Sequence, residues 1–258
     1  MKKTNATRIP PAVFFSELIG TALLLGVGLS FVIADFGTGS PVLRLLPDPG
    51  FRRLLTGFLF GTTGALIAVS PIGKYSGARR NPVVTLAFWL LGKMQTGCAE
   101  SYVAAQLIGA ILGSLPLLIW GAMGQSVQFG ATTPGAAYGN AMALWGETAT
   151  TFALIIGLFL FLRHARLRIF TPLLFPFLYA FMVYVEAPVS GTSTNPARSL
   201  GPSLISGNWQ GWWVYWVGPI LGTVLAVALY RQTWLRKLEI DVAKLFYFKH
   251  DPHGIFKK

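Results

Sequence analysis

The sequence predicts an all-α membrane protein, with six transmembrane helices and two half-helices arranged as an inverted three-span repeat. Three observations lead to this fold class. Of the 258 residues, 53% are hydrophobic and 12% are charged, which is about half the charged share of soluble domains. Six apolar stretches are long enough to cross a bilayer, and one seven-residue pattern occurs twice, once in each half of the chain.

The six apolar stretches define the predicted spans. A helix needs about 20 residues to cross the hydrocarbon core, and the few charges disfavour the alternative of a soluble α-bundle with a large core. The stretches cover residues 12–34, 54–72, 98–122, 141–162, 169–187 and 211–230. We expect one membrane channel domain over residues 1–258, with repeat 1 at about 12–122, repeat 2 at about 141–230 and a basic tail at 231–258.

The basic residues are distributed unevenly between the two sides of these spans. A net charge of +12 suggests a nucleic-acid partner at first sight. However, 17 of the 21 basic residues fall on one side, in the segments before span 1, between spans 2 and 3, between spans 4 and 5, and after span 6. The other side holds Arg44, Arg52, Arg53 and Arg198. The positive-inside rule therefore predicts that both termini lie in the cytoplasm. This topology accounts for the positive charge, so we expect no nucleic-acid partner. We expect a multi-pass protein of the plasma or inner membrane.

The repeated pattern is S-G-x-x-x-N-P. It occurs at residues 76–82 and again at 190–196, an offset of 114 residues. A weaker repeat relates residues 109–113 to 218–222. Because each unit holds three spans, the two copies would lie in the membrane with opposite orientations. Inverted repeats of this kind are typical of transport proteins, with the working site at the repeat interface.

Each Asn-Pro pair precedes an apolar run that is too short to span the bilayer, at residues 82–92 and 196–206. Asparagine is a good N-cap and proline is favoured at the first helical position. Eleven helical residues rise about 16 Å, so two such helices entering from opposite faces would meet near the centre of the membrane. Their positive dipole ends and two asparagine amides would face one cavity, where they would disfavour cations and interrupt proton hopping.

These residues resemble the aquaporin, or major intrinsic protein, family over nearly the whole chain. The first span contains Glu17, Gly20 and Thr21 in the family's spacing, and residues 190–199 match its second motif closely. The first motif departs at two positions: Val83 replaces the usual alanine, and Arg79 stands where members usually have histidine. The resemblance implies that the centre of a pore is formed by Asn81, Pro82, Val83, Asn195, Pro196 and Ala197.

The resemblance also implies a homotetramer with one pore per subunit and an extracellular constriction, the selectivity filter. Carried over by spacing, the filter positions are Phe60 (or Gly61 if the helix register shifts by one), Val183, Thr192 and Arg198. Arg79 would add a cation at the cytoplasmic mouth, where it could narrow or gate the pore. Glu17 and Glu147 would be structural carboxylates that brace the two Asn-Pro loops.

The filter residues point to two solute classes. Water-selective members usually have histidine at the position of Val183, so valine favours glycerol or other small neutral solutes. Ser199, the pair Tyr215-Trp216 and Thr192 are typical of water channels. We expect a passive channel for water that excludes ions and protons, with a glycerol or small-solute facilitator as the alternative. A coupled secondary transporter is disfavoured, since the groups at the centre are two asparagines rather than titratable residues.

No enzyme, cofactor or metal site is expected. No catalytic arrangement occurs in suitable spans, and the three histidines have no metal-ligand company in sequence. The single cysteine, Cys98, rules out an intramolecular disulfide.

Overall fold

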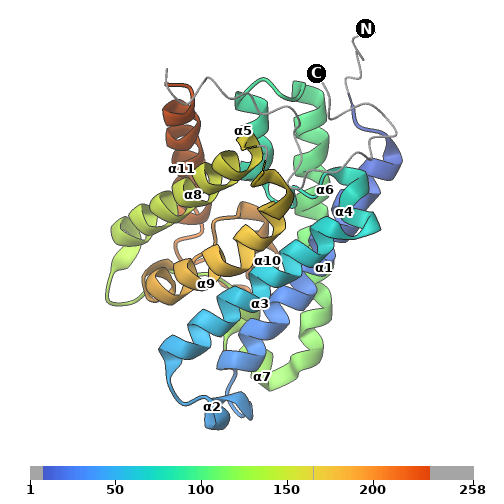
Figure 1. Cartoon of the computed structure of the whole chain (residues 1–258). Helices are drawn as coiled ribbons and strands as arrows, with labels where there is room; N and C mark the ends of the chain where they lie inside the picture. The colour runs from blue at the N-terminus through green and yellow to red at the C-terminus, as the bar shows by residue number, and fades with distance from the viewer. Residues whose placement is uncertain (1–7, 165, 233–258) are drawn as a thin grey trace, which may run out of the picture.

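The computed structural model describes residues 8–164 and 166–232, and within them every regular element is a helix (Figure 1). The first half of the chain contains α1 (Pro11–Phe36), α2 (Val42–Leu45), α3 (Pro49–Val69), α4 (Pro71–Ser76), α5 (Pro82–Leu90), α6 (Thr96–Ser114), η1 (Leu115–Trp120) and α7 (Gly121–Gln125). The second half contains η2 (Gln128–Gly130), α8 (Gly139–Arg163), η3 (Arg168–Phe170), α9 (Thr171–Ser190), α10 (Pro196–Ser206) and α11 (Val214–Tyr230).

The predicted spans and half-helices are present, with shifted ends. α3 begins at Pro49, five residues before the prediction, because the Asp48 carboxylate caps it by accepting the Phe51 N–H at 2.6 Å. The third span changes to a 3₁₀ helix at Leu115, next to Pro116, which cannot donate a backbone hydrogen bond. Of the predicted basic tail 231–258, residues 233–258 lie outside the described part of the chain.

Length and hydropathy alone identify fewer spans than the six apolar stretches predict. Four described helical segments satisfy both criteria, namely Pro11–Phe36, Thr96–Gln125, Gly139–Arg163 and Arg168–Ser190. α11 is apolar but has only 17 residues. α3 has 21 residues and carries Arg52 and Arg53 near its start. α3 and α11 are the other two spans, because α3 packs along α9 and α1, and α11 packs along α8.

Glycines allow the helices of each half to cross closely. A Cβ on Gly109 or Gly113 of α6 would lie within 2.3 Å of a carbonyl oxygen of α1. The equivalent Gly222 of α11 would place a Cβ 2.4 Å from the Thr148 carbonyl of α8. Only a residue without a side chain fits such contacts, which are common between membrane helices. The weak sequence repeat at 109–113 and 218–222 is therefore a repeated helix-crossing motif.

The outer surface of the bundle is apolar. Large hydrophobic side chains that would be buried in a soluble protein are exposed on α1, α9 and α11, among them Phe15, Phe177, Phe181 and Leu225. Exposed apolar surface of this extent indicates contact with lipid rather than water. The chain is a multi-span membrane protein.

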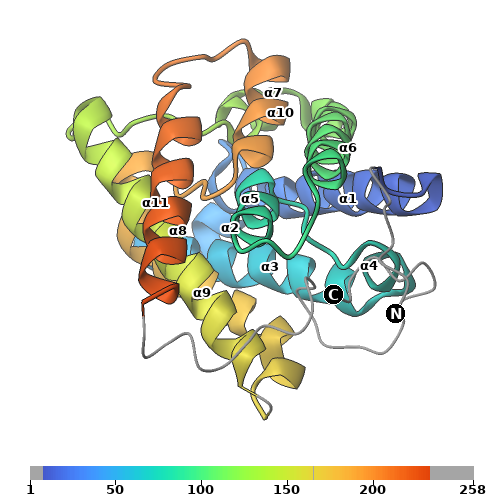
Figure 2. The same cartoon turned by 90° about the horizontal axis from the view of Figure 1, so that it is seen from above.

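The two half-helices, α5 and α10, lie inside the bundle (Figure 2). α5 belongs to the first repeat but packs against α11 of the second as well as against α6. α10 belongs to the second repeat and packs against α6 of the first. The two half-helices also contact each other, so the repeats interlock at the centre of the molecule.

Candidate functional site

The two asparagines cap the half-helices and join the two repeats. The Asn81 side-chain oxygen accepts the Val83 N–H at 3.0 Å, and that of Asn195 accepts the Ala197 N–H at 3.0 Å. Each amide nitrogen then donates across the centre, from Asn81 to the Thr194 carbonyl at 2.9 Å and from Asn195 to the Arg80 carbonyl at 3.1 Å. This reciprocal bonding fixes the two helix N-termini against each other.

The loops before the asparagines share one backbone conformation. Ala78 and Arg80 have φ of 60° and 46°, and their equivalents 114 residues later, Thr192 and Thr194, have φ of 51° and 52°. Left-handed backbone is unfavourable for residues with a side chain, so surrounding contacts must hold it. The repeat is therefore preserved at the level of individual dihedral angles.

Two buried carboxylates hold these loops. Glu147 accepts hydrogen bonds from the Ser190 hydroxyl at 2.7 Å and from the N–H groups of Ser193 and Thr194 at 2.6 and 2.7 Å. In the first repeat, Glu17 accepts the Arg80 N–H and a bond from the Gln106 amide at 2.8 Å. Both glutamates direct their carboxylate at loop backbone, which is the arrangement expected of structural carboxylates.

Buried tyrosines brace the same loops from the third span of each repeat. The Tyr102 hydroxyl donates to the Ser76 carbonyl at 2.6 Å, and the Tyr215 hydroxyl donates to the Ser190 carbonyl at 2.8 Å. The Ser199 hydroxyl bonds those of Ser193 and Thr132, both at 2.6 Å. Ser199 and Tyr215 are two of the residues typical of water channels. Both of them bond residues of the loops and their surroundings.

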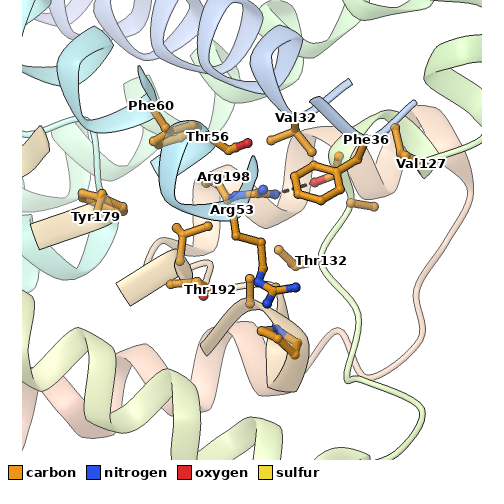
Figure 3. Close-up of a pocket in the computed structure, with 16 residues that line it drawn as sticks. Val32, Phe36, Arg53, Thr56, Phe60, Val127, Thr132, Tyr179, Thr192 and Arg198 are labelled. Atoms are coloured by element: carbon orange, nitrogen blue, oxygen red, sulfur yellow. Dashed lines mark hydrogen bonds between the residues drawn. The ribbon is translucent and has the colours of Figure 1, made fainter. Parts of the chain in front are cut away.

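An outer cavity of about 320 Å³ lies on the side where α1 and α9 end (Figure 3). The structure brings the four filter candidates together in its lining, namely Phe60, Val183, Thr192 and Arg198. Gly61 does not line the outer cavity. A Cβ there would lie 2.4 Å from the Phe175 carbonyl, so Gly61 is a packing position against α9. The geometry favours Phe60 over Gly61 at the filter.

Arg198 is held in the wall of the outer cavity and is 7% exposed. Its Nη1 donates to the Gly130 carbonyl at 2.5 Å, in the connection between the two repeats (Figure 3). That connection turns inward through positive φ values at Gln128 and Phe129, and the Phe129 ring is buried against α1 residues such as Leu29. The inter-repeat segment thus fixes a buried guanidinium in the wall of the outer cavity.

The structure reveals polar neighbours of the filter that the sequence analysis missed. Tyr179, one turn before Val183, lines the outer cavity and bonds the Thr194 hydroxyl at 2.9 Å. The Thr192 hydroxyl donates to buried Glu186 at 2.6 Å, so it is engaged with α9. A carboxylate within an apolar span is a signal that could have identified Glu186 from the sequence. Tyr179 gives no such signal.

A smaller inner cavity of about 50 Å³ lies next to the outer one, toward the start of α9, and the two share Phe60 and Tyr179 in their linings. Asn81 and Asn195 line it together with Arg79 and Arg80. Arg79 is 2% exposed, and its guanidinium lies 4.1 Å from the centre of the Tyr102 ring and 5.5 Å from that of Phe88. Its predicted role in gating stays a prediction. Val83, which replaces the usual alanine, is buried and lines neither cavity, whereas the next residue, Val84, lines the inner one.

No group of three or more histidine, cysteine, aspartate or glutamate residues in the described part of the chain is arranged to hold a metal ion.

Comparison with known proteins identifies the family. The family model of the major intrinsic proteins matches residues 12–230. The chain is 31% identical to Aquaporin-4 of Mus musculus over 233 residues, covering 87% of this chain and 68% of the relative. It is 36% identical to Aquaporin TIP4-4 of Zea mays over 215 residues, covering 81% of this chain and 84% of the relative. The fold matches the X-ray structure of the aquaglyceroporin from Plasmodium falciparum with a TM-score of 0.71 and 21% identity, over 86% of this chain and 96% of that one.

Two neighbouring cavities that share Phe60 and Tyr179, the inner one lined by the paired asparagines, are thus found in an inverted helical repeat of a chain whose relatives are aquaporins. The protein belongs to the major intrinsic protein family and is a passive membrane channel, not an enzyme.

Proposed function

We propose that the channel conducts water and excludes ions and protons. The observation that carries this proposal is the meeting of two capped half-helices at the wall of the inner cavity, which Asn81 and Asn195 both line. Each directs the positive end of its dipole and one asparagine amide toward the centre. A water molecule there accepts hydrogen bonds from the amides and donates away from them, which breaks a proton-conducting chain.

The size of the inner cavity favours water over larger solutes. It offers about 50 Å³, against about 320 Å³ for the outer cavity. A water molecule requires roughly 10–15 Å³ by this measure, so the inner cavity accommodates a short file of water. A three-carbon polyol needs continuous room for six heavy atoms and must displace several waters at once.

Val183 supports the second candidate, a facilitator for glycerol or other small neutral solutes. It lines the outer cavity beside Phe60, so one wall of the filter is apolar. An apolar wall tolerates the carbon backbone of a polyol, while Arg198 bonds its hydroxyl groups. The two candidates differ in whether the inner cavity or the filter determines what passes.

Stopped-flow light scattering on proteoliposomes decides between these candidates. With an impermeant osmolyte, we expect vesicles containing the protein to shrink faster than protein-free vesicles. With glycerol outside, slow re-swelling would establish selectivity for water. Fast re-swelling would assign the channel to the small-solute facilitators, and shrinkage no faster than that of empty vesicles would contradict both.

We also propose a homotetramer with one pore in each subunit. Both cavities and all four filter residues come from one chain, so assembly is not needed to complete the pore. The exposed apolar surface is available to lipid and to neighbouring copies. Size-exclusion chromatography with light scattering, corrected for bound detergent, should give the mass of four chains. A monomer that still conducts would contradict the assembly and leave the pore assignment intact.

For topology, we propose that both termini lie on the cytoplasmic face of the plasma or inner membrane. Of the 21 basic residues, three are buried in the structure and are not loop charges, namely Arg79, Arg80 and Arg198. The remaining basic residues keep the same strong asymmetry, so the positive-inside rule still supports this orientation.

A further inference from the structure

Arg80 places a second buried guanidinium at a cavity wall, in the inner cavity that Asn81 and Asn195 also line, whereas Arg198 lines the outer cavity. The residue is 3% exposed and lines the inner cavity. Its Nη2 donates to the Gly64 carbonyl at 2.9 Å, and Gly64 itself lines the inner cavity. The end of the side chain is therefore at the wall of the cavity.

One nitrogen of this guanidinium is left without a partner. Arg80 Nη1 is buried and makes no hydrogen bond to any described residue. An orphaned, buried cationic donor is costly, so it indicates a group that is meant to meet the contents of a cavity. The aliphatic part of the side chain packs against α1 at Gly20, where a Cβ would make an ordinary van der Waals contact with Arg80 Cδ at 3.4 Å.

The same residue is built into the centre of the pore through its backbone. Its carbonyl accepts the amide of Asn195, and its N–H donates to Glu17. Glu17 is also the carboxylate whose charge acts on the Arg80 guanidinium. Glu147 stands in the same relation to Arg198 in the second repeat. Each repeat thus combines a carboxylate behind its loop with an arginine at a cavity wall.

The two arginines occupy different positions in their motifs. Arg198 follows its asparagine by three residues and lies at the outer cavity, whereas Arg80 precedes its asparagine by one and lies at the inner cavity. The outer and the inner cavity therefore each have a buried guanidinium in their wall. A cation that passes one of them still meets the other.

We propose that Arg80 is a second specificity-determining residue, a barrier to cations and protons on the inner side that acts independently of Arg198. This inference rests on the proposed channel function. A unit charge about 5 Å from a guanidinium, at an effective dielectric constant near 20, is disfavoured on the order of a hundredfold. We take the two arginines, rather than the break in the water file at the asparagines, to limit the leak. The two barriers in series then add as resistances, so removing either arginine leaves the leak limited by the other.

The test measures proton entry and water permeability in the same proteoliposomes. Four proteins are compared, namely wild type, Arg198→Val, Arg80→Met and the double variant. Proton entry is followed with an internal pH dye, with the membrane potential clamped by potassium and valinomycin. We expect each single variant to leak protons within about threefold of wild type, and the double variant to leak at least about tenfold more than either.

The reverse pattern overturns the inference. If Arg198→Val leaks as much as the double variant while water permeability persists, Arg80 is not a barrier. A wild-type protein without water permeability would instead contradict the proposed function, so the two failures are distinguishable.

Two further variants separate charge from folding. Arg80→Lys combined with Arg198→Val keeps the positive charge at the inner cavity, so this variant should leak no more protons than Arg198→Val alone. A leak equal to that of the Arg80→Met double variant would show that charge is not the cause. Because Arg80→Met leaves Glu17 without its counter-charge, the triple variant Glu17→Gln, Arg80→Met and Arg198→Val removes both charges. If it elutes as wild type, it should leak like the double variant.

Discussion

At the scale of single residues, we expect Val183 to determine how the proposed filter treats solutes larger than water. It shares the wall of the outer cavity with Phe60, Thr192 and Arg198. We predict that Val183→His reduces any glycerol flux severalfold and largely spares water, because the imidazole narrows the ring and adds a polar group. Stopped-flow re-swelling in glycerol and shrinkage in an impermeant osmolyte measure the two fluxes.

Val183→Thr is the matched control for this change. Threonine has nearly the volume of valine, so it adds polarity without narrowing the filter. A glycerol flux that falls in Val183→His but not in Val183→Thr would assign the effect to width. Equal losses of water and glycerol in Val183→His would show that position 183 does not form the narrowest part of the filter.

Glu147 determines whether the second Asn-Pro loop keeps its shape. Its carboxylate accepts two backbone N–H groups and one hydroxyl, and it is fully buried. We predict that Glu147→Gln lowers the melting temperature by about 5 °C or more, since an amide presents one acceptor oxygen where two are used. Thermal unfolding of the detergent-solubilised protein measures this, together with a loss of water permeability.

The same substitution at Glu100, an exposed acid of α6, provides the comparison. Glu100→Gln should leave the melting temperature within about a degree, as exposed changes usually do. Equal melting temperatures for the two variants would mean that Glu147 does not hold the loop.

At the scale of helices, the glycines set how closely the spans of each repeat approach. We predict that Gly222→Ala destabilises the protein, because a Cβ at 2.4 Å from the Thr148 carbonyl oxygen forces α11 away from α8. Gly157→Ala in α8 is the matched control, since the nearest atom to its Cβ is a flexible leucine carbon at 3.6 Å. Alanine favours helix by up to about 1 kcal/mol over glycine, so Gly157→Ala should melt at or above the wild-type temperature. A Gly222→Ala variant that melts no lower would show that the crossing can relax.

A helix cap and a proline explain where the helix ends differ from the predicted spans. Apolar runs predict the parts of helices that lipid and neighbours cover, whereas caps determine where they start. α3 extends five residues beyond its apolar run because Asp48 satisfies its first turn. Pro116 converts the end of the third span to 3₁₀ geometry within an unbroken apolar stretch.

At the scale of the whole molecule, the proposed topology predicts which loops can be labelled from outside the cell. On a Cys98→Ser background, which removes the only cysteine, a single cysteine is introduced at exposed Thr38 or exposed His164. We predict that Thr38→Cys reacts with a membrane-impermeant maleimide on intact cells, and that His164→Cys reacts only after permeabilisation. The opposite pattern would invert the assignment of the two faces.

The sequence by itself determined the class of fold, the duplication and the centre of the site. Apolar length, charge asymmetry and the paired S-G-x-x-x-N-P pattern are local properties, because helix formation, capping and membrane insertion depend on a few neighbouring residues. The asparagine caps and the half-helices could both be predicted in this way.

Only the tertiary structure decided which side chains share a cavity. Phe60 rather than Gly61 faces the filter because α3 packs its glycine against the backbone of α9. Arg80 has a left-handed backbone conformation, and its side chain reaches the Gly64 carbonyl at the wall of the inner cavity. Contacts between residues so distant in the chain depend on how helices pack, and no local pattern encodes that packing.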